Sequence, residues 1–330
     1  MITVAIFGPT AVGKTGVAIA LAEALRERGE DPVAINCDAM QVYRGLELVS
    51  AAPDEGELGR LEHRLLGFVD VTEEFSAGRF APLAHTEIDA ALAAGRRPLV
   101  VGGTGLYLRA ALAELELRPP VPTAVREQVE RELTERGLEA LHAELEPALR
   151  TAVHPNDRKR IARYLELQRA GIEPPRGSEQ LWTAKLRHPT LLAGLVTERE
   201  ALQERIETRL EAMLAAGAAE QARRALAGRA AAEQACRTPV DRATGEAVVG
   251  GRVADAAGIS RTAAQMIGLE ALAAGDVERA LIEHRQYARR QLTWMRKMAG
   301  VEPIDRTGRT DTEVAAELLA RLDTPADALR

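Results

Sequence analysis

The 330-residue sequence has few aromatic residues and no excess of positive charge. Aromatics make up 3% of the chain, and its hydrophobic residues, 46% in all, are mostly alanine, leucine and valine, so we expect an aliphatic, helix-rich core. The formal net charge of −6 argues against nucleic-acid binding by the whole surface, although it leaves room for a local basic patch. A soluble chain of this length holds one large domain or two modest ones.

The sequence also lacks a cysteine framework and a long hydrophobic run. Its two cysteines, Cys37 and Cys236, match neither a disulfide pattern nor the spacing of zinc ligands, which favours a reducing compartment. No apolar run approaches the roughly 20 residues that span a bilayer, and the first residues have the pattern of a core strand and not of a signal peptide. We therefore expect a cytoplasmic protein without a membrane segment, and a monomer.

The most informative motif is GPTAVGKT at residues 8–15, which follows an apolar run at 2–7 and precedes a helical pattern at 17–25. Strand, glycine loop and helix in this order form a P-loop, in which backbone N–H groups and a helix N-terminus point at one phosphate group. Lys14 adds a positive charge and Thr15 a hydroxyl for Mg²⁺. The context disfavours the alternative, an ordinary glycine turn. The motif predicts a cradle for a diphosphate or triphosphate, formed by Gly8, Pro9, Thr10, Ala11, Val12, Gly13, Lys14 and Thr15.

Further short apolar runs alternate with helical patterns along the chain. The runs at 32–37, 97–101 and 191–196 have the length of buried strands, and there are helical patterns at 82–94 and 198–216. This alternation predicts an α/β fold with a P-loop NTPase-like, doubly wound parallel sheet.

Two polar residues follow these predicted strands. Asp38 comes directly after 32–37, and Thr104 lies in a second glycine turn, GGTG, after 97–101. Because ligands bind outside the carboxyl ends of parallel strands, we expect both side chains to face the pocket of the P-loop. Aspartate is also a favoured cap of turns and helices, and this alternative for Asp38 stays open.

The α/β alternation stops at the proline-rich stretch 118–122. Residues 124–168 have charged helical patterns without a strand, so we expect a helical insertion domain at 119–189, between the two parts of the catalytic core, 1–118 and 190–330. The insertion contains a basic run from Arg158 to Arg163, whose alternative interpretation is a solvated helix face.

Two further segments of the core stand out. Residues 284–297 contain five Lys or Arg, no acid and two aromatics. Such a helix either presents guanidinium groups to phosphates or docks its aromatic residues in the core while the arginines meet solvent. The segment 228–258 is rich in alanine, glycine and charge without periodicity, and we expect a mobile surface excursion there.

The P-loop leaves three classes of protein open: a small-molecule kinase, another NTPase, and a transferase that uses an alkyl diphosphate. An NTPase usually has an acid at the end of a buried strand to hold Mg²⁺. The run at 97–101 ends in glycines instead, and only Asp38, within DAMQVYR, could take that role.

Six motifs resemble, in the same order, those of the tRNA dimethylallyltransferase family. They are GPTAVGKT, DAMQVYR, HRLL at 63–66, PLVVGGTGLYL at 98–108, HPNDRKRIAR at 154–163 and RQYARRQLTWMR at 285–296. The resemblance covers about the whole chain. It implies transfer of the dimethylallyl group of dimethylallyl diphosphate to the exocyclic amine of the adenosine just 3′ of the tRNA anticodon, with Mg²⁺ and release of diphosphate. The chain departs from the family pattern at Gly67, where an Asp is often found, at Leu269, where an aromatic is common, and in its long segment 230–258.

The resemblance and the chemistry of the residues together suggest roles. The adenine amine is a weak nucleophile, and Asp38 is the expected general base. The P-loop and Lys14 would stabilise the leaving diphosphate with Mg²⁺ near Thr15. The catalytic residues are expected to be Asp38, Thr104 and Lys14. The anticodon stem-loop of tRNA is expected to contact Asp38, Ala39, Met40, Gln41, Thr104, Arg126, Arg158, Lys159, Arg163, Arg285 and Arg289.

Overall fold

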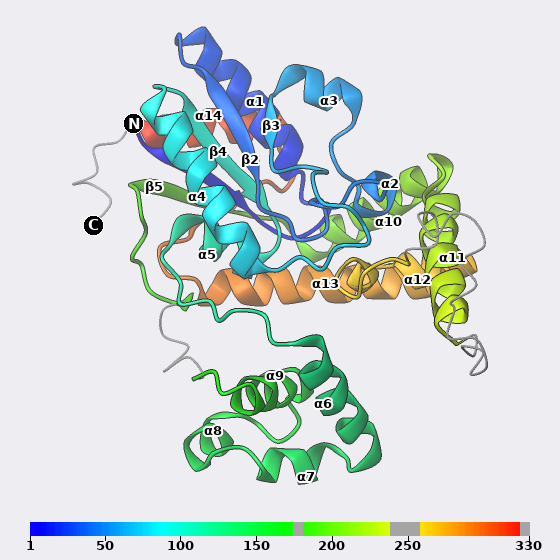
Figure 1. Cartoon of the computed structure of the whole chain (residues 1–330). Helices are drawn as coiled ribbons and strands as arrows, with labels where there is room; N and C mark the ends of the chain where they lie inside the picture. The colour runs from blue at the N-terminus through cyan, green and yellow to red at the C-terminus, as the bar shows by residue number, and fades with distance from the viewer. Residues whose placement is uncertain (174–180, 238–257, 324–330) are drawn as a thin grey trace. The chain divides into compact units, whose positions relative to one another are not determined.

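The computed structural model of the chain describes residues 1–173, 181–237 and 258–323. It divides into two compact units, Met1–Glu114 together with Leu181–Arg330, and Leu115–Gln180 (Figure 1). The first unit contains the sheet, and the described part of the second consists of helices and loops.

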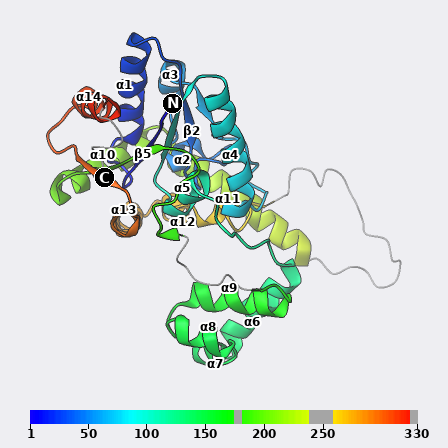
Figure 2. The ribbon, with the colours of Figure 1, turned by 90° about the vertical axis from the view of Figure 1, so that its left-hand side faces the viewer.

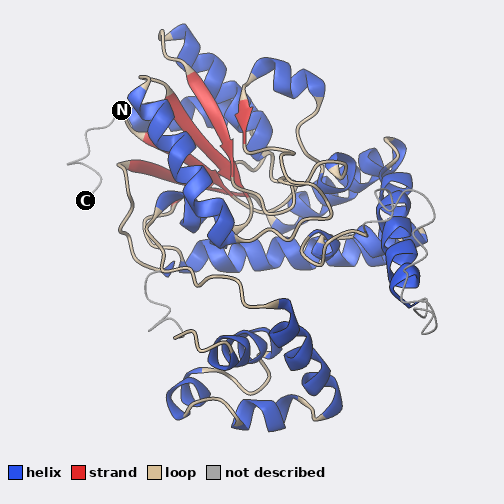
Figure 3. Ribbon diagram, viewed as in Figure 1, coloured by secondary structure: helices blue, strands red, loops and turns tan. Residues whose placement is uncertain are grey.

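The described residues of the first unit form one sheet of six parallel strands (Figure 3). The spatial order is β3-β2-β4-β1-β5-β6, which confirms the predicted doubly wound parallel sheet. The four central strands are buried on both faces, and for this reason they appear in the sequence as continuous apolar runs. The strands are β1 (Thr3–Phe7), β2 (Pro32–Asn36), β3 (His63–Arg64), β4 (Arg97–Gly102), β5 (Thr190–Val196) and β6 (Glu302–Asp305).

Helices cover both faces of the sheet (Figure 2). On one face α1 (Lys14–Glu27) packs against α14 (Asp311–Leu322), and on the other α4 (Ala77–Ala93) packs against α5 (Gly105–Leu112). Leu21 of α1 and Leu318 of α14 belong to one aliphatic core together with buried residues of the strands. The low aromatic content is thus compensated by close packing of branched aliphatic side chains.

The longest described helix, α13 (Val277–Lys297), runs past the carboxyl ends of the strands (Figure 1). It packs against α10 (Arg199–Ala215), the helix that follows β5. The remaining described helices of this unit are α2 (Glu47–Ser50), α3 (Glu55–Arg60), α11 (Ala218–Arg237) and α12 (Leu269–Ala274).

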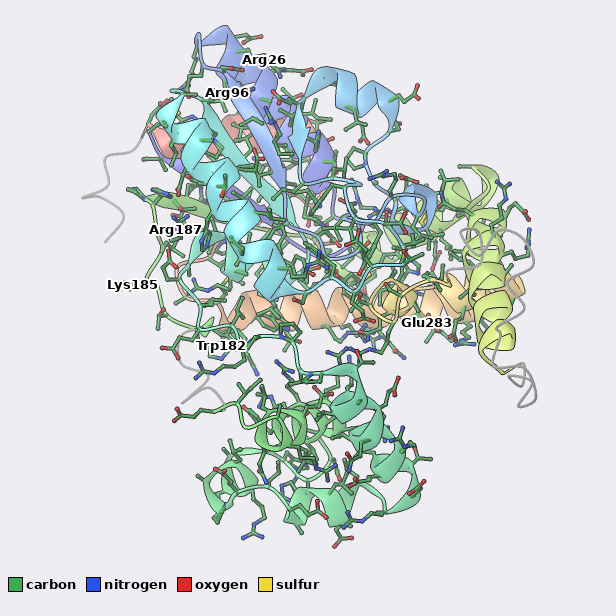
Figure 4. The ribbon with its side chains drawn as sticks, in the orientation of Figure 1. Arg26, Arg96, Trp182, Lys185, Arg187 and Glu283 are labelled. Atoms are coloured by element: carbon green, nitrogen blue, oxygen red, sulfur yellow. The ribbon has the colours of Figure 1, made fainter. Side chains whose placement is uncertain are left out.

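The segment before β5 is fixed to the first unit by an ion-pair network around the partly buried Arg187. Arg187, labelled in Figure 4, donates to Asp89 Oδ2 of α4 at 2.9 Å and to Glu114 Oε1 at 2.7 Å. Its backbone N–H also donates to the carbonyl of Leu112. These bonds explain why the residues just before β5 belong to the first unit although we expected an insertion as far as residue 189.

The second unit has a small core of its own. Val129, Leu133, Leu141 and Leu165 are buried together. Arg169 adds ion pairs to this core: its guanidinium lies 2.7 Å from a carboxylate oxygen of Glu132 and 3.1 Å from one of Glu144. The helices are α6 (Thr123–Glu135), α7 (Leu138–Ala143), α8 (Pro147–Ala152) and α9 (Arg158–Arg169).

Several elements differ from the sequence-based expectations. Helix α4 begins at Ala77, five residues before the predicted start at Pro82, because the Ser76 hydroxyl accepts a hydrogen bond from the backbone N–H of Arg79 and caps the helix. Helix α11 continues to Arg237, into the segment where we expected a mobile excursion, and residues 238–257 of that segment lie outside the described residues. Strands β3 and β6 were not predicted because they are too short to show a period.

None of the helices in the described ranges is both long enough and apolar enough to span a membrane.

The packing of α14 on α1 predicts a large loss of stability for Leu318→Ala. Leu318 is fully buried, and truncation of such a leucine costs about 2–5 kcal/mol because a cavity remains. Urea unfolding monitored by circular dichroism should show this loss as a lower midpoint. The control is Leu83→Ala on α4, where the side chain is 40% exposed and a change within about 0.5 kcal/mol is expected. Equal midpoints for the two variants would mean that α14 does not support the core.

Candidate active site

Residues 8–15 lead from the end of β1 into the first turn of α1, in the strand, loop and helix order expected of a P-loop. Gly13 has φ of 92°, a left-handed backbone that favours glycine, and a Cβ at this position would lie 1.7 Å from Arg306 Nη1. Lys14 Nζ donates to the carbonyl of Gly8 at 3.1 Å and to that of Pro9 at 2.9 Å. The ammonium group is therefore held at the loop itself, where it can meet an incoming phosphate.

Two arginines from distant parts of the chain bind the outer side of this loop. Arg306 is 4% exposed, donates to the carbonyl of Val12 and pairs with Asp311 at 3.0 Å. Arg205 of α10 donates to the carbonyl of Ala11 at 3.1 Å. The C=O and N–H of a trans peptide point in opposite directions. Because the carbonyls of Ala11 and Val12 face these arginines, the N–H groups of the same two peptide bonds point away from the arginines.

A third arginine, Arg209, lies one turn further along α10. It donates to Thr10 Oγ1 at 3.1 Å and to the carbonyl of Ala51 at 2.9 Å. Burial lowers the pKa of Arg209, and the nearby Asp38 carboxylate opposes that effect. A guanidinium stays protonated in such a site, so Arg209 supplies a fixed positive charge beside the P-loop.

Asp38 lies directly beyond the carboxyl end of β2. Its Oδ1 accepts the backbone N–H of Met40 at 2.9 Å, and its own N–H donates to Asn36 Oδ1 at 3.2 Å. Asn36 is in turn fixed by a bond of 2.9 Å to the carbonyl of Leu65. One carboxylate oxygen thus caps a turn, as in the alternative interpretation, while the residue also lines the cavity beside the P-loop.

Thr104 connects the Asp38 loop to α13. Its Oγ1 accepts the backbone N–H of Ala39 at 3.1 Å and lies 3.2 Å from the hydroxyl of Tyr287. Burial raises the pKa of Tyr287, with the negative charge of Asp38 acting in the same direction, so this hydroxyl remains neutral. The sequence predicted that Thr104 faces the pocket of the P-loop, but its hydroxyl is engaged by Ala39 and Tyr287 and Thr104 is not among the residues that line the cavity.

The site lines a cavity of about 810 Å³ in the first unit. The polar groups of the lining include the P-loop, Asp38, Arg209 and four further acids, Glu47, Asp54, Glu57 and Asp311. The lining also includes aliphatic and thioether groups, namely Met40, Leu48, Val49, Met213, Met266 and Ile267. A cavity that combines a phosphate-binding loop with apolar side chains fits an amphiphilic ligand with an anionic head.

The expected tRNA-contacting residues fall into separate groups. Ala39, Met40 and Gln41 follow Asp38, and Gln41 is fixed by a bond of 3.1 Å from its side chain to the carbonyl of Ala51. On α13, Arg285 pairs with Glu207 of α10 while Arg289 is exposed.

The residues expected in the insertion belong to the second unit. Arg158 pairs with Glu130 at 2.7 Å, and Arg163 donates to the carbonyl of Pro119 at 2.9 Å. Arg163 and Arg126 both lie near the buried Glu166, at 3.2 and 3.9 Å. Lys159 is exposed and makes no ion pair with any described residue.

Comparison with known proteins relates this site to one family. A family model described as IPP transferase matches residues 41–298. A tRNA dimethylallyltransferase from Anaeromyxobacter sp. (strain Fw109-5) is 37% identical over 300 residues, which are 90% of this chain and 92% of the relative. The chain belongs to the tRNA dimethylallyltransferase family.

Solved structures agree with this assignment. The full-length tRNA isopentenylpyrophosphate transferase of Bacillus halodurans is similar over 98% of this chain and 97% of its own, with a TM-score of 0.62 and 27% identity. A eukaryotic dimethylallyltransferase, solved acting on tRNA, has a TM-score of 0.64 and 25% identity over 99% of this chain and 76% of its own.

Sequence reasoning missed Arg209, Tyr287 and Gln291, all of which line the cavity. Arg209 is one of several charged residues on an amphipathic helix, and only its distance from the P-loop distinguishes it. Tyr287 and Gln291 are four residues apart and so share a face of α13. This spacing indicates that they contact the same part of the protein, but the sequence does not show which part.

The ionisation of Lys14 predicts a pH dependence for anion binding. Desolvation lowers the pKa of Lys14 to about 8 in the free protein, although Asp38 opposes the shift. The charged form binds an anion, so the affinity should be constant well below pH 8 and should fall as the pH rises through that value.

Titration calorimetry of inorganic diphosphate with Mg²⁺ between pH 6.5 and about 9.5 measures this effect. The Lys14→Arg variant stays charged over this pH range. The ratio of the wild-type Kd to the variant Kd therefore cancels the effect of diphosphate ionisation, which is the same for both proteins. The wild-type to variant Kd ratio should rise by up to about tenfold per pH unit above the pKa. A flat ratio would show that Lys14 does not contact the anion.

Proposed function

We propose that this enzyme transfers the dimethylallyl group from dimethylallyl diphosphate to the exocyclic amine, N6, of the adenosine 3′-adjacent to the tRNA anticodon, and releases diphosphate. The observation that carries the proposal is the cavity that brings Asp38 and the P-loop together with apolar side chains, next to which Thr104 is hydrogen-bonded to the loop that follows Asp38. Family membership supports it, because curated relatives are named tRNA dimethylallyltransferases. A P-loop kinase is disfavoured, since β4 ends in glycines and not in a metal-binding acid.

The chemistry uses groups of opposite charge at the two ends of the reacting bond. The N6–C1 bond forms as the bond from C1 to the diphosphate oxygen breaks, and the N6 proton passes to the Asp38 carboxylate. Lys14, Arg209 and the P-loop N–H groups stabilise the charge that develops on the leaving diphosphate. The thioether and aliphatic wall holds the dimethylallyl group and keeps water from the carbon that reacts.

Mg²⁺ fits this donor set as a substrate-borne ion. In phosphate sites Mg²⁺ keeps several waters and binds through one or two protein oxygens together with phosphate oxygens. The Thr15 hydroxyl at the start of α1 is the protein ligand we propose. The described residues contain no group of three or more His, Cys, Asp or Glu side chains that could hold a metal by itself. When bound, the ion would neutralise charge on the diphosphate.

The acceptor adenosine must leave its stack to reach the cavity. We propose that Thr104 and the Ala39–Gln41 loop contact this base and its neighbours, and that Arg285 and Arg289 of α13 contact the anticodon stem-loop. The 119–189 insertion would add backbone contacts through Arg126, Arg158, Lys159 and Arg163. In this proposal the enzyme works as a cytoplasmic monomer.

The direct test combines two assays on the same preparation. Dimethylallyl diphosphate labelled in the dimethylallyl group is incubated with an anticodon stem-loop, and ATP hydrolysis is measured in parallel. Label in the RNA without ATP turnover supports the transferase. Phosphate release from ATP without labelled RNA supports a P-loop NTPase and contradicts the proposal.

The role of Asp38 predicts the behaviour of Asp38→Asn. The amide keeps the hydrogen bond to the backbone N–H of Met40 but cannot accept a proton, so turnover should fall by roughly two to four orders of magnitude. Binding of tRNA and of dimethylallyl diphosphate should stay nearly normal in filter-binding and calorimetric measurements. If excess Mg²⁺ restored most of the rate, Asp38 would be a metal ligand and not the base.

The ion pairs of the second unit sharpen the prediction for tRNA binding. Lys159 is exposed and makes no ion pair with a described residue, whereas Arg136 is engaged by Glu144 and by Glu132 at 3.2 Å. A lost phosphate contact lowers the slope of log K against log salt by about one. Lys159→Ala should show this decrease for an anticodon stem-loop, and Arg158→Ala should change the slope less, because Glu130 already pairs with that guanidinium. The control Arg136→Ala should leave the slope unchanged. Equal slopes for all variants would show that the basic run is a solvated helix face that does not contact tRNA.

A further inference from the structure

One stripe of α13 supports the whole GGTG turn at residues 102–105. Tyr287, Gln291 and Trp294 follow one another at helical spacing of four and three residues and so face the same side. The Tyr287 hydroxyl lies 3.2 Å from Thr104 Oγ1, and Gln291 is hydrogen-bonded to the turn. Trp294 lies against Gly105 of the turn, and the centre of its ring is 4.9 Å from that of Trp182.

Gln291 bonds to both glycine loops of the site at once. Its Nε2 donates to the carbonyl of Gly103 at 2.8 Å, and its Oε1 accepts the backbone N–H of Thr10 at 2.7 Å. The side chain is 4% exposed, so both bonds form away from bulk water. A buried amide with both ends engaged fixes the distance between the P-loop and the GGTG turn, since loss of either bond leaves a buried polar group unsatisfied.

Two of the three glycines of the turn, Gly103 and Gly105, are required by the contact with α13. A Cβ on Gly103 would lie 2.2 Å from Gln291 Nε2 and 3.3 Å from both Lys14 Nζ and the carbonyl of Gly8. A Cβ on Gly105 would lie 2.5 Å from the Trp294 ring. Gly103 is therefore the point where the P-loop, the turn and α13 meet.

From this geometry we infer that Gln291 is a positioning residue, which holds the diphosphate-binding loop and the acceptor-side turn in register. The inference rests on the proposed function, which assigns the P-loop to the diphosphate and the GGTG turn to the acceptor. Gln291 forms no bond to a catalytic side chain. It acts on Lys14 through the P-loop backbone and on Thr104 through the peptide before it. A change of about 1 Å in such a register is enough to cost about 10²-fold in rate.

The test uses Gln291→Met, which keeps the volume and removes both bonds. The expected result is a KM for dimethylallyl diphosphate and a Kd for inorganic diphosphate with Mg²⁺ that each rise about tenfold, and a kcat that falls about 10–100-fold. The Kd for an anticodon stem-loop should change less than twofold. Gln286→Met, at an exposed position of the same helix, is the matched control and should leave the KM and the diphosphate Kd unchanged.

A merely structural role predicts a different result. Loss of folded enzyme lowers kcat in proportion to the active fraction and leaves the KM and the diphosphate Kd as in the wild type, and that outcome overturns the inference. If the wild type transfers no dimethylallyl group, the proposed function fails by itself, and the diphosphate Kd still decides the role of Gln291.

A second experiment approaches the same contact from Gly103, for the case that Gln291→Met does not fold. Gly103→Ala should raise the diphosphate Kd about tenfold because its methyl group displaces the Gln291 amide. In the Gln291→Ala background the clash with that amide is gone, so the same change should raise the Kd less than threefold. Equal increases in both backgrounds would show that the amide and the turn are not coupled.

Discussion

The structure depends on hydrogen bonds that gather positive charge around one short loop. Lys14, Arg205 and Arg306 all donate to carbonyls of the P-loop. These bonds satisfy the cations before an anion arrives, and they turn the loop carbonyls outward so that N–H groups remain for the ligand. The same bonds tie α10 and the segment before α14 to the loop, so the sheet, the distant helices and the site form one cooperative unit.

How far the site follows from the sequence depends on chain distance. The P-loop and the position of Asp38 beside it were predictable because each follows a buried strand, and parallel strands bring their carboxyl ends together. Thr104 also follows a strand, but it is not among the residues that line the cavity. Arg209 and Gln291 were not predictable, because they lie within long helices and their hydrogen-bond partner in the P-loop is 199 and 281 residues away along the chain. Helical periodicity shows which residues share a face but not what that face meets.

Helix α13 shows why the two interpretations of its sequence were both incomplete. The buried side of α13 contains His284, Ala288, Gln291 and Met295, and its exposed side contains Arg289, Arg290, Arg296 and Lys297. Docking in the core and presentation of arginines are therefore properties of opposite faces. Gln291 on the buried side is informative, because a buried amide is retained only where its hydrogen bonds are satisfied.

The second unit explains why a basic run in sequence is not yet a basic surface. Of the four cations from Arg158 to Arg163, the arginines are engaged by Glu130, Asp157 and Glu166, and these acids come from the same unit. Pairing reduces the charge that a polyanion meets and also holds each guanidinium in one geometry. A phosphate would therefore compete with carboxylates for the arginines, whereas Lys159 makes no ion pair with any described residue. The unit thus offers a polyanion fewer unpaired charges than its composition suggests.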